Sequence, residues 1–450
     1  MLDLNARNVL RSEMAGSVAL HKIAADVLAA QVVATVDMPQ PLYVSHAKGS
    51  RVWDVDGREY IDLTMGFGTH VLGHAPASVV EAVSAQAARG LQYGLHNPYQ
   101  VQLAQLLLEA APAMDEVVFT NSGTEATMYA VRAARAFTGK TGIALFDGSY
   151  HGVHDAVLAG ALRDSPREAP LAYAKGDGIP ASTMADVLML PYRSAAAFDL
   201  IRSRRETLAA VLVEPVQSSN PRVDVADWLK ELRNVCAECG VLFILDEVIT
   251  GFRLAFGGAQ ERFGITADMA TYGKALGGGA PIGAVAGKGD IMGVFGRGAP
   301  AQSHGAGKVR IFAGTSFAGN PLAMCAGIAA VTEMRDRKSE IYPRLEARSQ
   351  RLAEDVNAFL TAKQMPVQLR RGGSMFHMPF QRGEIGSARD VRGENPELEN
   401  EFYMRLLANG VIVPGIHVAF LSDAHSDADI NLVLVAYIRS FQQMRDADLL

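Results

Sequence analysis

The sequence predicts an α/β protein with a mostly parallel central sheet. Several short apolar runs have the composition of strands that are buried on both faces of a sheet. These runs are residues 116–120, 142–146, 209–213 and 241–245. Helical patterns, such as residues 125–137 and 226–239, separate the runs. Because strands that alternate with helices favour a parallel sheet covered by helices, we expect one large α/β domain over residues 70–330.

The segment before this domain contains a predicted β-hairpin. Over residues 50–62, residue types alternate on both sides of Asp56-Gly57. An Asp-Gly pair between two alternating runs is a strong signal for a tight turn between antiparallel strands. We expect residues 1–69 to join the smaller domain of the protein.

The segment after the large domain predicts helices and short strands. Residues 339–361 have the pattern of a long amphipathic helix, in which Pro343 is tolerated because it falls in the first turn. Strand-like pieces follow over residues 367–380, and a last helix begins at Asp427. We expect residues 331–450 to complete a smaller α+β domain together with the N-terminal segment.

The composition indicates a globular protein with a small-molecule partner. The chain has 450 residues, of which 49% are hydrophobic, and a net charge of -6. It contains no block of Lys and Arg that would favour nucleic acid, and no apolar run of about 18 residues that would favour a membrane span. Residues 1–38 lack the continuous apolar core of a signal peptide, so we expect a cytoplasmic location.

The three cysteines predict neither a disulfide framework nor a metal site. Cys236 and Cys239 lie at the end of a predicted helix, and no second pair of ligands is close to them in the sequence. Cys325 stands alone. Such spacing is more typical of ordinary helix residues than of zinc ligands, so we expect no bound metal.

A candidate anion site lies at Ser122-Gly123-Thr124. A predicted strand ends there and a helix begins, so free backbone N–H groups and the positive end of the helix meet at one place. Phosphate suits such a place. An alternative needs no ligand, because Ser122 and Glu125 have the spacing of a capping box.

A second stretch resembles the end of a nucleotide-binding loop but fails the test of spacing. Gly139-Lys140-Thr141 would need a glycine at position 134, where the sequence has Ala134. Gly139 also follows a helix and precedes a strand, which is the reverse of the required order. A nucleotide hydrolase is therefore disfavoured.

Lys274 and Asp246 each follow an apolar strand-like run. An amine and a carboxylate at buried strand ends are what pyridoxal phosphate chemistry requires, one as the Schiff-base former and the other as the partner of the pyridine nitrogen. Taken alone, Asp246 would be read as the cap of a turn and Lys274 as a solvated surface residue. In the order phosphate turn, Asp246, Lys274, the three features are much more specific.

Six ordered motifs carry a resemblance to a known family. They are Asn121-Ser-Gly-Thr-Glu-Ala-Thr127, Tyr150-His-Gly152, Val213-Glu-Pro-Val216, Asp246-Glu-Val-Ile-Thr-Gly-Phe-Arg253, Gly273-Lys274 with Gly277-Gly-Gly279, and Gly314-Thr315 with Gly319-Asn-Pro321. The chain resembles the class III, fold type I enzymes that depend on pyridoxal 5'-phosphate. Its motifs are most similar to those of the glutamate-1-semialdehyde aminomutase group and its aminotransferase relatives, over about residues 50–430.

The resemblance implies roles for the central residues of these motifs. Lys274 would form the Schiff base with the cofactor and carry the proton during the reaction. Asp246 would keep the pyridine nitrogen protonated, so that the ring accepts electrons. Ser122, Gly123 and Thr124 would bind the phosphate.

The resemblance also implies roles for residues around the ring. Tyr150 would stack on one face of the ring and Val248 would pack on the other. Gln217 or Ser219 would meet the ring hydroxyl. Thr315 would reach the phosphate of the neighbouring subunit, which implies a homodimer with shared active sites.

The chain departs from the aminomutases at three places that bear on the substrate. Their N-terminal arginine, which holds the substrate carboxylate, has no counterpart among residues 32–39. Since arginine is strongly favoured for bidentate carboxylate binding, this absence argues against glutamate-1-semialdehyde as the substrate. Phe67 stands where the family usually has tryptophan, and His417 stands where a glutamate precedes the element at residues 422–426.

The stretch over residues 297–310 is long and basic. A solvated loop is the simpler interpretation. Because the stretch is close in sequence to Thr315, our hypothesis is that Lys308 or Arg310 contacts an anionic group of the donor or the acceptor.

The sequence therefore favours an aminotransferase that moves an amino group from an amino-acid donor to an aldehyde or ketone. Absence of the aminomutase arginine suits an acceptor without an α-carboxylate, such as an acyl chain from a biosynthetic pathway, either free or tethered to a carrier. An aminomutase or amino-acid racemase is the alternative. A non-catalytic relative is disfavoured because Lys274 and Asp246 are both present.

Overall fold

The computed structural model describes residues 14–29, 42–296, 311–391, 396–413 and 418–450. The chain forms two compact units. The large unit consists of Ala77–Tyr342 and Ile385–Asp390, and the terminal unit consists of Met1–Pro76, Pro343–Glu384 and Val391–Leu450. The domain boundaries expected from the sequence, after residues 69 and 330, stay a prediction.

The large unit contains a seven-stranded sheet with the order β4-β12-β11-β10-β9-β5-β8. Its strands are β4 (Glu116–Thr120), β5 (Gly142–Phe146), β8 (Val187–Leu190), β9 (Leu208–Val213), β10 (Leu242–Asp246), β11 (Met269–Gly273) and β12 (Gly283–Gly287). Neighbouring strands from β8 to β11 are parallel, whereas β12 is antiparallel to both β11 and β4. The predicted mostly parallel sheet is confirmed.

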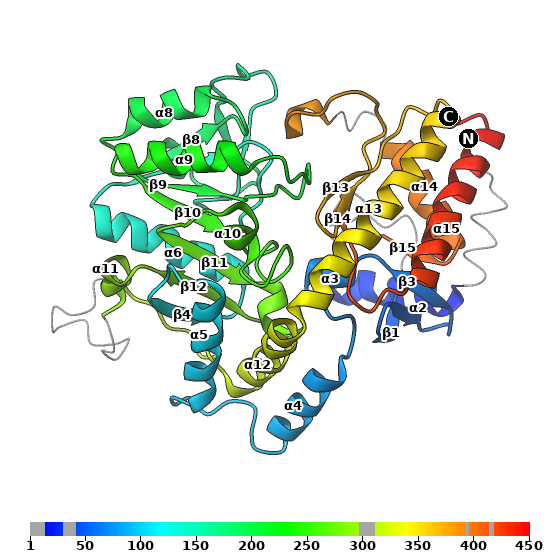
Figure 1. Cartoon of the computed structure of the whole chain (residues 1–450), viewed down its shortest axis with the longest axis horizontal. Helices are drawn as coiled ribbons and strands as arrows, with labels where there is room; N and C mark the ends of the chain where they lie inside the picture. Colours follow the sequence, from blue (N-terminus) through cyan, green and yellow to red (C-terminus); the bar gives the residue numbers. More distant parts are fainter. Residues whose placement is uncertain (1–13, 30–41, 297–310, 392–395, 414–417) are drawn as a thin grey trace. The chain divides into compact units, whose positions relative to one another are not determined.

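Helices cover both faces of this sheet, as Figure 1 shows for α6 (Gly123–Thr138) and α9 (Ala226–Glu238). On β10, Ile244 is buried in the same cluster as Ala130 of α6. The residue before it, Phe243, packs against Arg233 of α9, with 6.0 Å between the guanidinium carbon and the ring centroid. Because side chains alternate along a strand, Asp246 points to the same side as Ile244, toward the face of α6.

The other helices of the large unit complete its outer layers. They are α4 (Ala77–Ala87), α5 (Pro98–Ala110), α7 (Ala181–Ala185), α8 (Ala196–Arg204), α10 (Gly258–Phe263), α11 (Gly289–Met292) and α12 (Pro321–Asp336). Helix α12 packs against α4, α5 and the short 3-10 turn η1 (Lys274–Gly277), which directly follows β11. The turn that contains Lys274 therefore packs directly against a long helix, α12.

The terminal unit combines two small sheets with five described helices. One sheet has the order β1-β2-β3-β15 and the other β13-β14-β16. The strands are β1 (Val44–Lys48), β2 (Arg51–Asp54), β3 (Glu59–Asp62), β13 (Arg370–Gly372), β14 (Met375–His377), β15 (Val411–Ile412) and β16 (Ala419–Phe420). The helices are α2 (Ala15–Val27), α3 (Met65–Gly68), α13 (Lys338–Ala362), α14 (Pro396–Ala408) and α15 (Asp427–Asp446). The first five residues of α13, 338–342, belong to the large unit. The predicted hairpin at Asp56-Gly57 is confirmed, because β2 and β3 pair antiparallel there.

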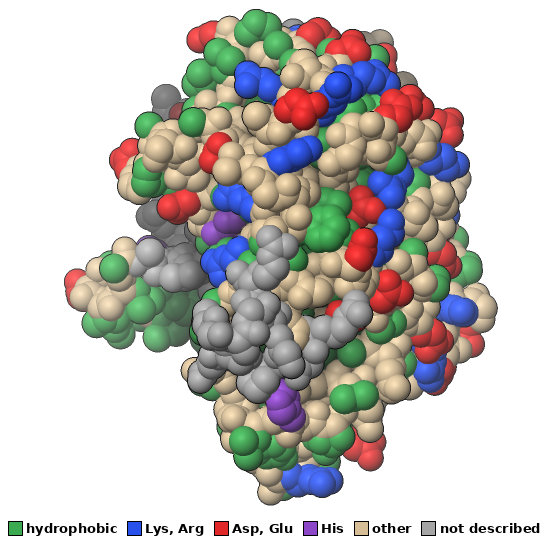
Figure 2. All heavy atoms as spheres, turned by 90° about the vertical axis from the view of Figure 1, so that its left-hand side faces the viewer, with side chains coloured by type: hydrophobic (Ala, Val, Ile, Leu, Met, Phe, Trp, Pro, Cys, Tyr) green, Lys and Arg blue, Asp and Glu red, His purple; other side chains and the backbone are tan. Residues whose placement is uncertain are grey.

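The surface carries charges of both signs. On the face displayed in Figure 2, Lys and Arg side chains lie among Asp and Glu side chains and do not form a field of one sign. Among the described residues, no helix combines the length and the apolar character needed to cross a membrane.

Asp268 links three parts of the large unit, and its removal should destabilise the fold. Its carboxylate accepts hydrogen bonds from Arg233 of α9 (3.0 Å), from Lys288 after β12 (2.8 Å) and from the backbone N–H of Phe243 on β10 (2.9 Å). The residue is only 7% exposed. Since Asp268→Ala leaves two cations without their partner, we expect a loss of about 3 kcal/mol in the free energy of unfolding, measured by denaturant titration.

The matched control is Asp336→Ala. Asp336 pairs with Arg335 on the surface, and its side chain is 58% exposed. Exposed pairs of this kind contribute at most about 1 kcal/mol. Equal losses in the two variants would show that the Asp268 contacts do not support the sheet.

Candidate active site

The candidate site lies in the large unit, at the carboxyl ends of its parallel strands. Ligands of open α/β sheets bind at this edge. The segments that meet there are residues 122–124 after β4, 147–152 after β5, 214–219 after β9, Asp246 at the end of β10 and Lys274 after β11. The fold thus gathers the motifs that the sequence placed in order along the chain.

The turn after β4 is a helix cap with free N–H groups. Ser122 Oγ accepts a hydrogen bond from the backbone N–H of Glu125 (3.1 Å), and the Glu125 carboxylate accepts one from the backbone N–H of Asn121 (2.7 Å). Ser122 therefore caps the helix, but the expected capping box is only half formed, because Glu125 bonds to the N–H of Asn121 and not to that of Ser122. This cap does not use the N–H groups of Gly123 and Thr124, which start a helix of 16 residues and suit a phosphate.

Two glycines allow the loops to approach this turn closely. A Cβ on Gly123 would lie 2.9 Å from Val248 Cγ1, and a Cβ on Gly152 would lie 2.5 Å from Thr124 Oγ1. Gly152 also has a φ of +99°, a conformation that side chains disfavour. Val248 and the loop after β5 therefore both pack closely against the turn.

Asp246 is buried and held by three donors. His151 Nδ1 lies 2.6 Å from Asp246 Oδ2, and Oδ1 accepts hydrogen bonds from Thr271 Oγ1 (3.0 Å) and from the backbone N–H of Val248 (3.1 Å). The exposed fraction of Asp246 is 4%. These contacts fix the direction of the carboxylate, as a partner for a protonated ring nitrogen requires.

His151 is a site residue that the sequence analysis did not assign. It is 3% exposed, and its Nε2 atom has no hydrogen-bond partner among the described residues. The motif Tyr150-His-Gly152 contained the signal, because a histidine beside a functional aromatic is a candidate partner for a buried carboxylate. The contact itself joins residues 95 positions apart and needs the fold.

Lys274 begins the turn η1 in a left-handed conformation, with a φ of 45°. Such a conformation costs a residue with a side chain about 1 kcal/mol or more, and it is often found at functional sites. Burial lowers the pKa of the Lys274 amine to about 8, although the carboxylates of Glu214 and Asp246 act in the opposite direction. A substantial neutral fraction at mild pH is what a nucleophilic amine needs.

Glu214 is a buried carboxyl beside these groups. Burial raises the pKa of Glu214 to about 7, against the effect of His151. Its Oε2 atom accepts a hydrogen bond from the backbone N–H of Tyr150 (3.0 Å). Glu214 therefore anchors the loop that carries both the aromatic and the histidine.

Tyr150 is half-exposed at the edge of the site, with an exposed fraction of 50%. Burial of the rest of the ring, followed by the charges of Asp246 and Glu214, raises the pKa of its hydroxyl. A phenol that stays neutral and presents an open face suits stacking on a planar ligand.

Gln217 and Ser219 are tied to the start of the loop after β5. Gln217 Nε2 donates to the carbonyl of Asp147 (2.9 Å) and to Ser149 Oγ (2.9 Å), and Ser219 Oγ donates to the carbonyl of Gly148 (2.8 Å). The Gln217 Oε1 atom is buried and has no partner among the described residues. A buried acceptor without a donor is costly unless a ligand supplies one.

These groups fit pyridoxal phosphate. The free N–H groups at residues 123–124 suit its phosphate, the oriented Asp246 carboxylate suits its ring nitrogen, and the Lys274 amine suits its aldehyde. The unpaired Gln217 Oε1 atom suits its ring hydroxyl. The donors and acceptors at this edge of the sheet thus match each polar group of the cofactor.

The remaining predicted residues are not all brought to this site. Thr315 Oγ1 accepts a hydrogen bond from Asn121 Nδ2 (2.6 Å) within the same chain, and its expected role in a neighbouring subunit stays a prediction. Phe67 belongs to α3 of the terminal unit, where it has a φ of 56°. Arg310 and His417 lie outside the described residues, as does the 32–39 segment.

The chain is similar to proteins of known family along most of its length. The sequence model of the class-III aminotransferase family matches residues 32–424. A curated glutamate-1-semialdehyde 2,1-aminomutase from Nitratidesulfovibrio vulgaris is 39% identical, over 88% of this chain and 90% of that protein.

Two solved structures are also similar to this chain along most of its length. An omega-transaminase from Sphaerobacter thermophilus has a TM-score of 0.88 at 30% identity, covering 95% of this chain and 98% of that one. A β-phenylalanine aminotransferase from Variovorax paradoxus has a TM-score of 0.84 at 28% identity, covering 98% and 97%. The predicted fold type I architecture is thereby confirmed, as are the predicted enzyme class and its cofactor, pyridoxal 5'-phosphate. This chain belongs to the class-III aminotransferase family.

Proposed function

We propose that this enzyme transfers the amino group of an amino-acid donor to an aldehyde or ketone acceptor that lacks an α-carboxylate. The observation that carries the proposal is the absence of an arginine from residues 32–39, where the aminomutases hold the substrate carboxylate. The name of the β-phenylalanine aminotransferase supports it, because the amine of that substrate is not on the carbon next to the carboxylate. A carrier-tethered acceptor and a cytoplasmic location belong to the same proposal.

Two proposed catalytic residues are Lys274, which acts at the substrate carbon, and Asp246, which acts at the ring nitrogen of the cofactor. Pyridoxal phosphate, when bound, supplies an electron sink for the carbanion that forms at the substrate carbon. The Lys274 amine would hold the cofactor covalently, and the same amine would move the proton at that carbon. Asp246 holds the proton of the ring nitrogen, and His151 and Thr271 keep its carboxylate aligned by the contacts described above.

The other proposed cofactor contacts position the ring. Ser122, Gly123 and Thr124 bind the phosphate at the N-terminus of α6. Tyr150 stacks on one face of the ring, and Val248 packs on the other. The contact of Val248 with the Gly123 turn supports this placement.

The ring hydroxyl and the subunit interface complete the proposal. Gln217 accepts from the hydroxyl through its unpaired Oε1 atom, and Ser219 stands beside it. Thr315 reaches the phosphate of the partner subunit in a homodimer with shared active sites.

Three further residues are proposed as substrate contacts. Phe67, Arg310 and His417 contact the donor or the acceptor. Their support is their place in the sequence, since Phe67 and His417 stand where the family has a tryptophan and a glutamate, and Arg310 is close to Thr315.

Isomerisation is the second candidate function. It is favoured by the 39% identity to a glutamate-1-semialdehyde 2,1-aminomutase. The two functions differ in their products, since an aminotransferase releases the keto acid of its donor and an aminomutase or racemase does not.

Incubation of the purified holoenzyme with single amino acids separates the two. We expect stoichiometric release of a keto acid, with conversion of the cofactor to its amine form in the visible spectrum. Chromatography on achiral and chiral columns follows the amino acid itself. A shifted or inverted amine without release of a keto acid would overturn the aminotransferase proposal.

Lys274→Ala tests the proposed attachment point. Because no other group replaces the amine, we expect activity to fall by at least about a thousandfold, as for other covalent catalysts. After borohydride treatment, mass spectrometry should find no cofactor adduct on the variant protein. Lys175→Ala removes an exposed lysine of the same unit and should keep both activity and adduct. An adduct that persists in Lys274→Ala would place the attachment elsewhere.

The pH dependence of cofactor capture tests the lowered pKa of Lys274. The amine reacts only when neutral, so the capture rate of the apoprotein should rise about tenfold per pH unit below about pH 8 and level off above it. In Glu214→Gln a carboxylate that raises the pKa of Lys274 is lost, so the midpoint should move to lower pH. Stopped-flow absorbance measures the rate. A profile that keeps rising through pH 10 in the wild type would contradict the desolvated amine.

A further inference from the structure

A short segment from the C-terminal half of the chain belongs to the large unit. Residues Ile385–Asp390 are grouped with Ala77–Tyr342, whereas the residues on both sides of the segment belong to the terminal unit. The segment ends in the 3-10 turn η3 (Ala388–Asp390). Asp390 Oδ2 accepts hydrogen bonds from the backbone N–H groups of Gly386 (3.0 Å) and Ser387 (2.9 Å), so the segment has a defined shape of its own. We call residues 385–390 the brace.

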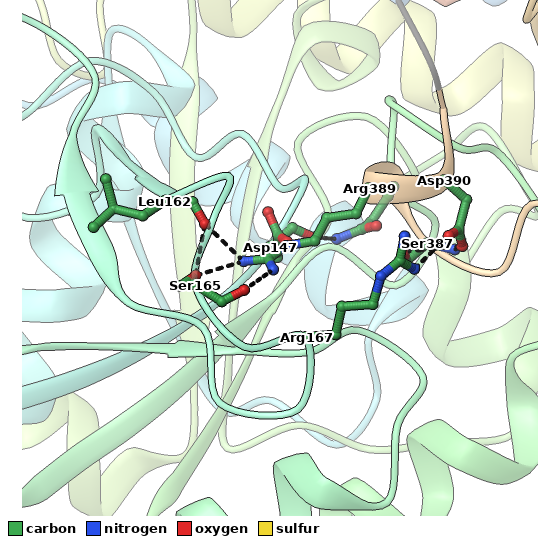
Figure 3. Close-up of polar contacts among 8 residues, drawn as sticks. Asp147, Leu162, Ser165, Arg167, Ser387, Arg389 and Asp390 are labelled. Atoms are coloured by element: carbon green, nitrogen blue, oxygen red, sulfur yellow. Dashed lines mark hydrogen bonds and ion pairs between the residues drawn. The ribbon is translucent and has the colours of Figure 1, made fainter.

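Arg389 of the brace joins two separate parts of the large unit (Figure 3). Its Nε atom pairs with the carboxylate of Asp147, which directly follows β5. Its Nη atoms donate to the carbonyl of Ser165 (2.9 Å), to Ser165 Oγ (3.0 Å) and to the carbonyl of Leu162 (3.3 Å). The side chains of Arg389 and Asp147 are 14% and 16% exposed, so solvent screens this pair only in part.

Asp147 is also the first residue of the loop that carries Tyr150 and His151. Its carbonyl accepts the hydrogen bond from Gln217 Nε2, and the next carbonyl, of Gly148, accepts the one from Ser219 Oγ. The brace packs on this point directly, because a Cβ on Gly148 would lie 2.3 Å from Ala388 Cβ.

The brace holds the loop after β9 as well. The carbonyl of Ile385 accepts hydrogen bonds from Asn220 Nδ2 (3.3 Å) and from Arg222 Nη1 (3.0 Å). Asn220 is buried and follows Ser219 in the chain. The two loops that carry the candidate ring contacts are thus attached to one segment of six residues.

We propose that Arg389 is a positioning residue for the cofactor site. By fixing Asp147, it sets the carbonyls that orient the side chains of Gln217 and Ser219, and with them the unpaired Gln217 Oε1 atom. Loss of the guanidinium removes the Arg389 donor from the Asp147 carboxylate and from the carbonyl of Ser165. The inference rests on the proposed role of Gln217 at the cofactor ring.

Arg167 provides a matched control within the same structure. It pairs with Asp390 of the brace, but its side chain is 64% exposed. It contacts neither Asp147 nor the loop after β9 in any described hydrogen bond. Exposed pairs contribute little, so Arg167→Ala removes an arginine that contacts the brace without moving the site.

The test compares cofactor affinity in the full-length variants. For Arg389→Ala, we expect the dissociation constant for pyridoxal phosphate, from titration of the apoprotein, to rise at least about tenfold. The circular dichroism of the bound cofactor in the visible range should weaken, because the ring is held less uniformly. Arg167→Ala should stay within about twofold of the wild type in both measurements. Arg389→Lys should lie between, since an ammonium can pair with Asp147 but cannot also reach Leu162 and Ser165.

A purely structural role for Arg389 gives a different result. In that case Arg389→Ala lowers the thermal midpoint of the apoprotein but keeps wild-type affinity and circular dichroism of the bound cofactor, and the proposal is overturned. If Arg389→Ala does not fold, Arg389→Lys and Asp147→Asn carry the test, because Asp147→Asn keeps the backbone carbonyl while removing the ion pair. Additive effects of Asp147→Asn and Arg389→Lys in the double variant would equally overturn it.

Gln217→Ala separates this inference from the proposed function. Weaker cofactor binding in Gln217→Ala together with wild-type binding in Arg389→Ala would overturn the positioning role alone. Wild-type binding in Gln217→Ala would overturn the proposed ring contact and the positioning role that depends on it. The adduct at Lys274 is measured independently of both.

Discussion

The buried contact between Asp246 and His151 is the interaction on which the rest of the site depends. A carboxylate that is 4% exposed is stable only if donors surround it, and here they come from three parts of the chain: the loop after β5, the residue Thr271 on β11 and the backbone after Asp246. The same hydrogen bonds therefore satisfy the buried charge and join the ends of β10 and β11 to the loop that follows β5.

The amine at Lys274 meets the opposite demand, because burial disfavours its charged form. Burial lowers the pKa of Lys274 to about 8 and raises the pKa of Glu214 to about 7, so both groups change charge within a narrow range around mild pH. Asp246 keeps several hydrogen-bond donors, whereas Glu214 accepts only from the backbone of Tyr150 among its described hydrogen bonds. The different surroundings of Asp246 and Glu214 thus allow these two carboxyl groups, both close to the Lys274 amine, to have different roles.

The sequence located the elements with a strong local signal, and the fold supplied the contacts between distant ones. The runs at residues 116–120 and 142–146 coincide with β4 and β5, because apolar β-forming residues are flanked there by turns. Strand β12 was not predicted, since Gly283–Gly287 has small residues and no alternation, and its antiparallel direction follows only from pairing with β4 and β11. The order of the motifs along the sequence identified Lys274 and Asp246 as candidate site residues. No local pattern could pair His151 with Asp246 or Arg389 with Asp147, which are 95 and 242 positions apart.

The late position of the brace in the sequence has a consequence for biosynthesis. Domains tend to fold from the N-terminal end while the chain emerges from the ribosome, so the strands and helices up to residue 342 can associate early. Residues Ile385–Asp390 emerge only after more than 40 further residues of the terminal unit, from Pro343 to Glu384, have been made. Until then the loops after β5 and β9 lack their common attachment. The nascent chain can therefore hold all seven strands of the sheet while the two loops at its ligand-binding edge still await the attachment that residues Ile385–Asp390 supply.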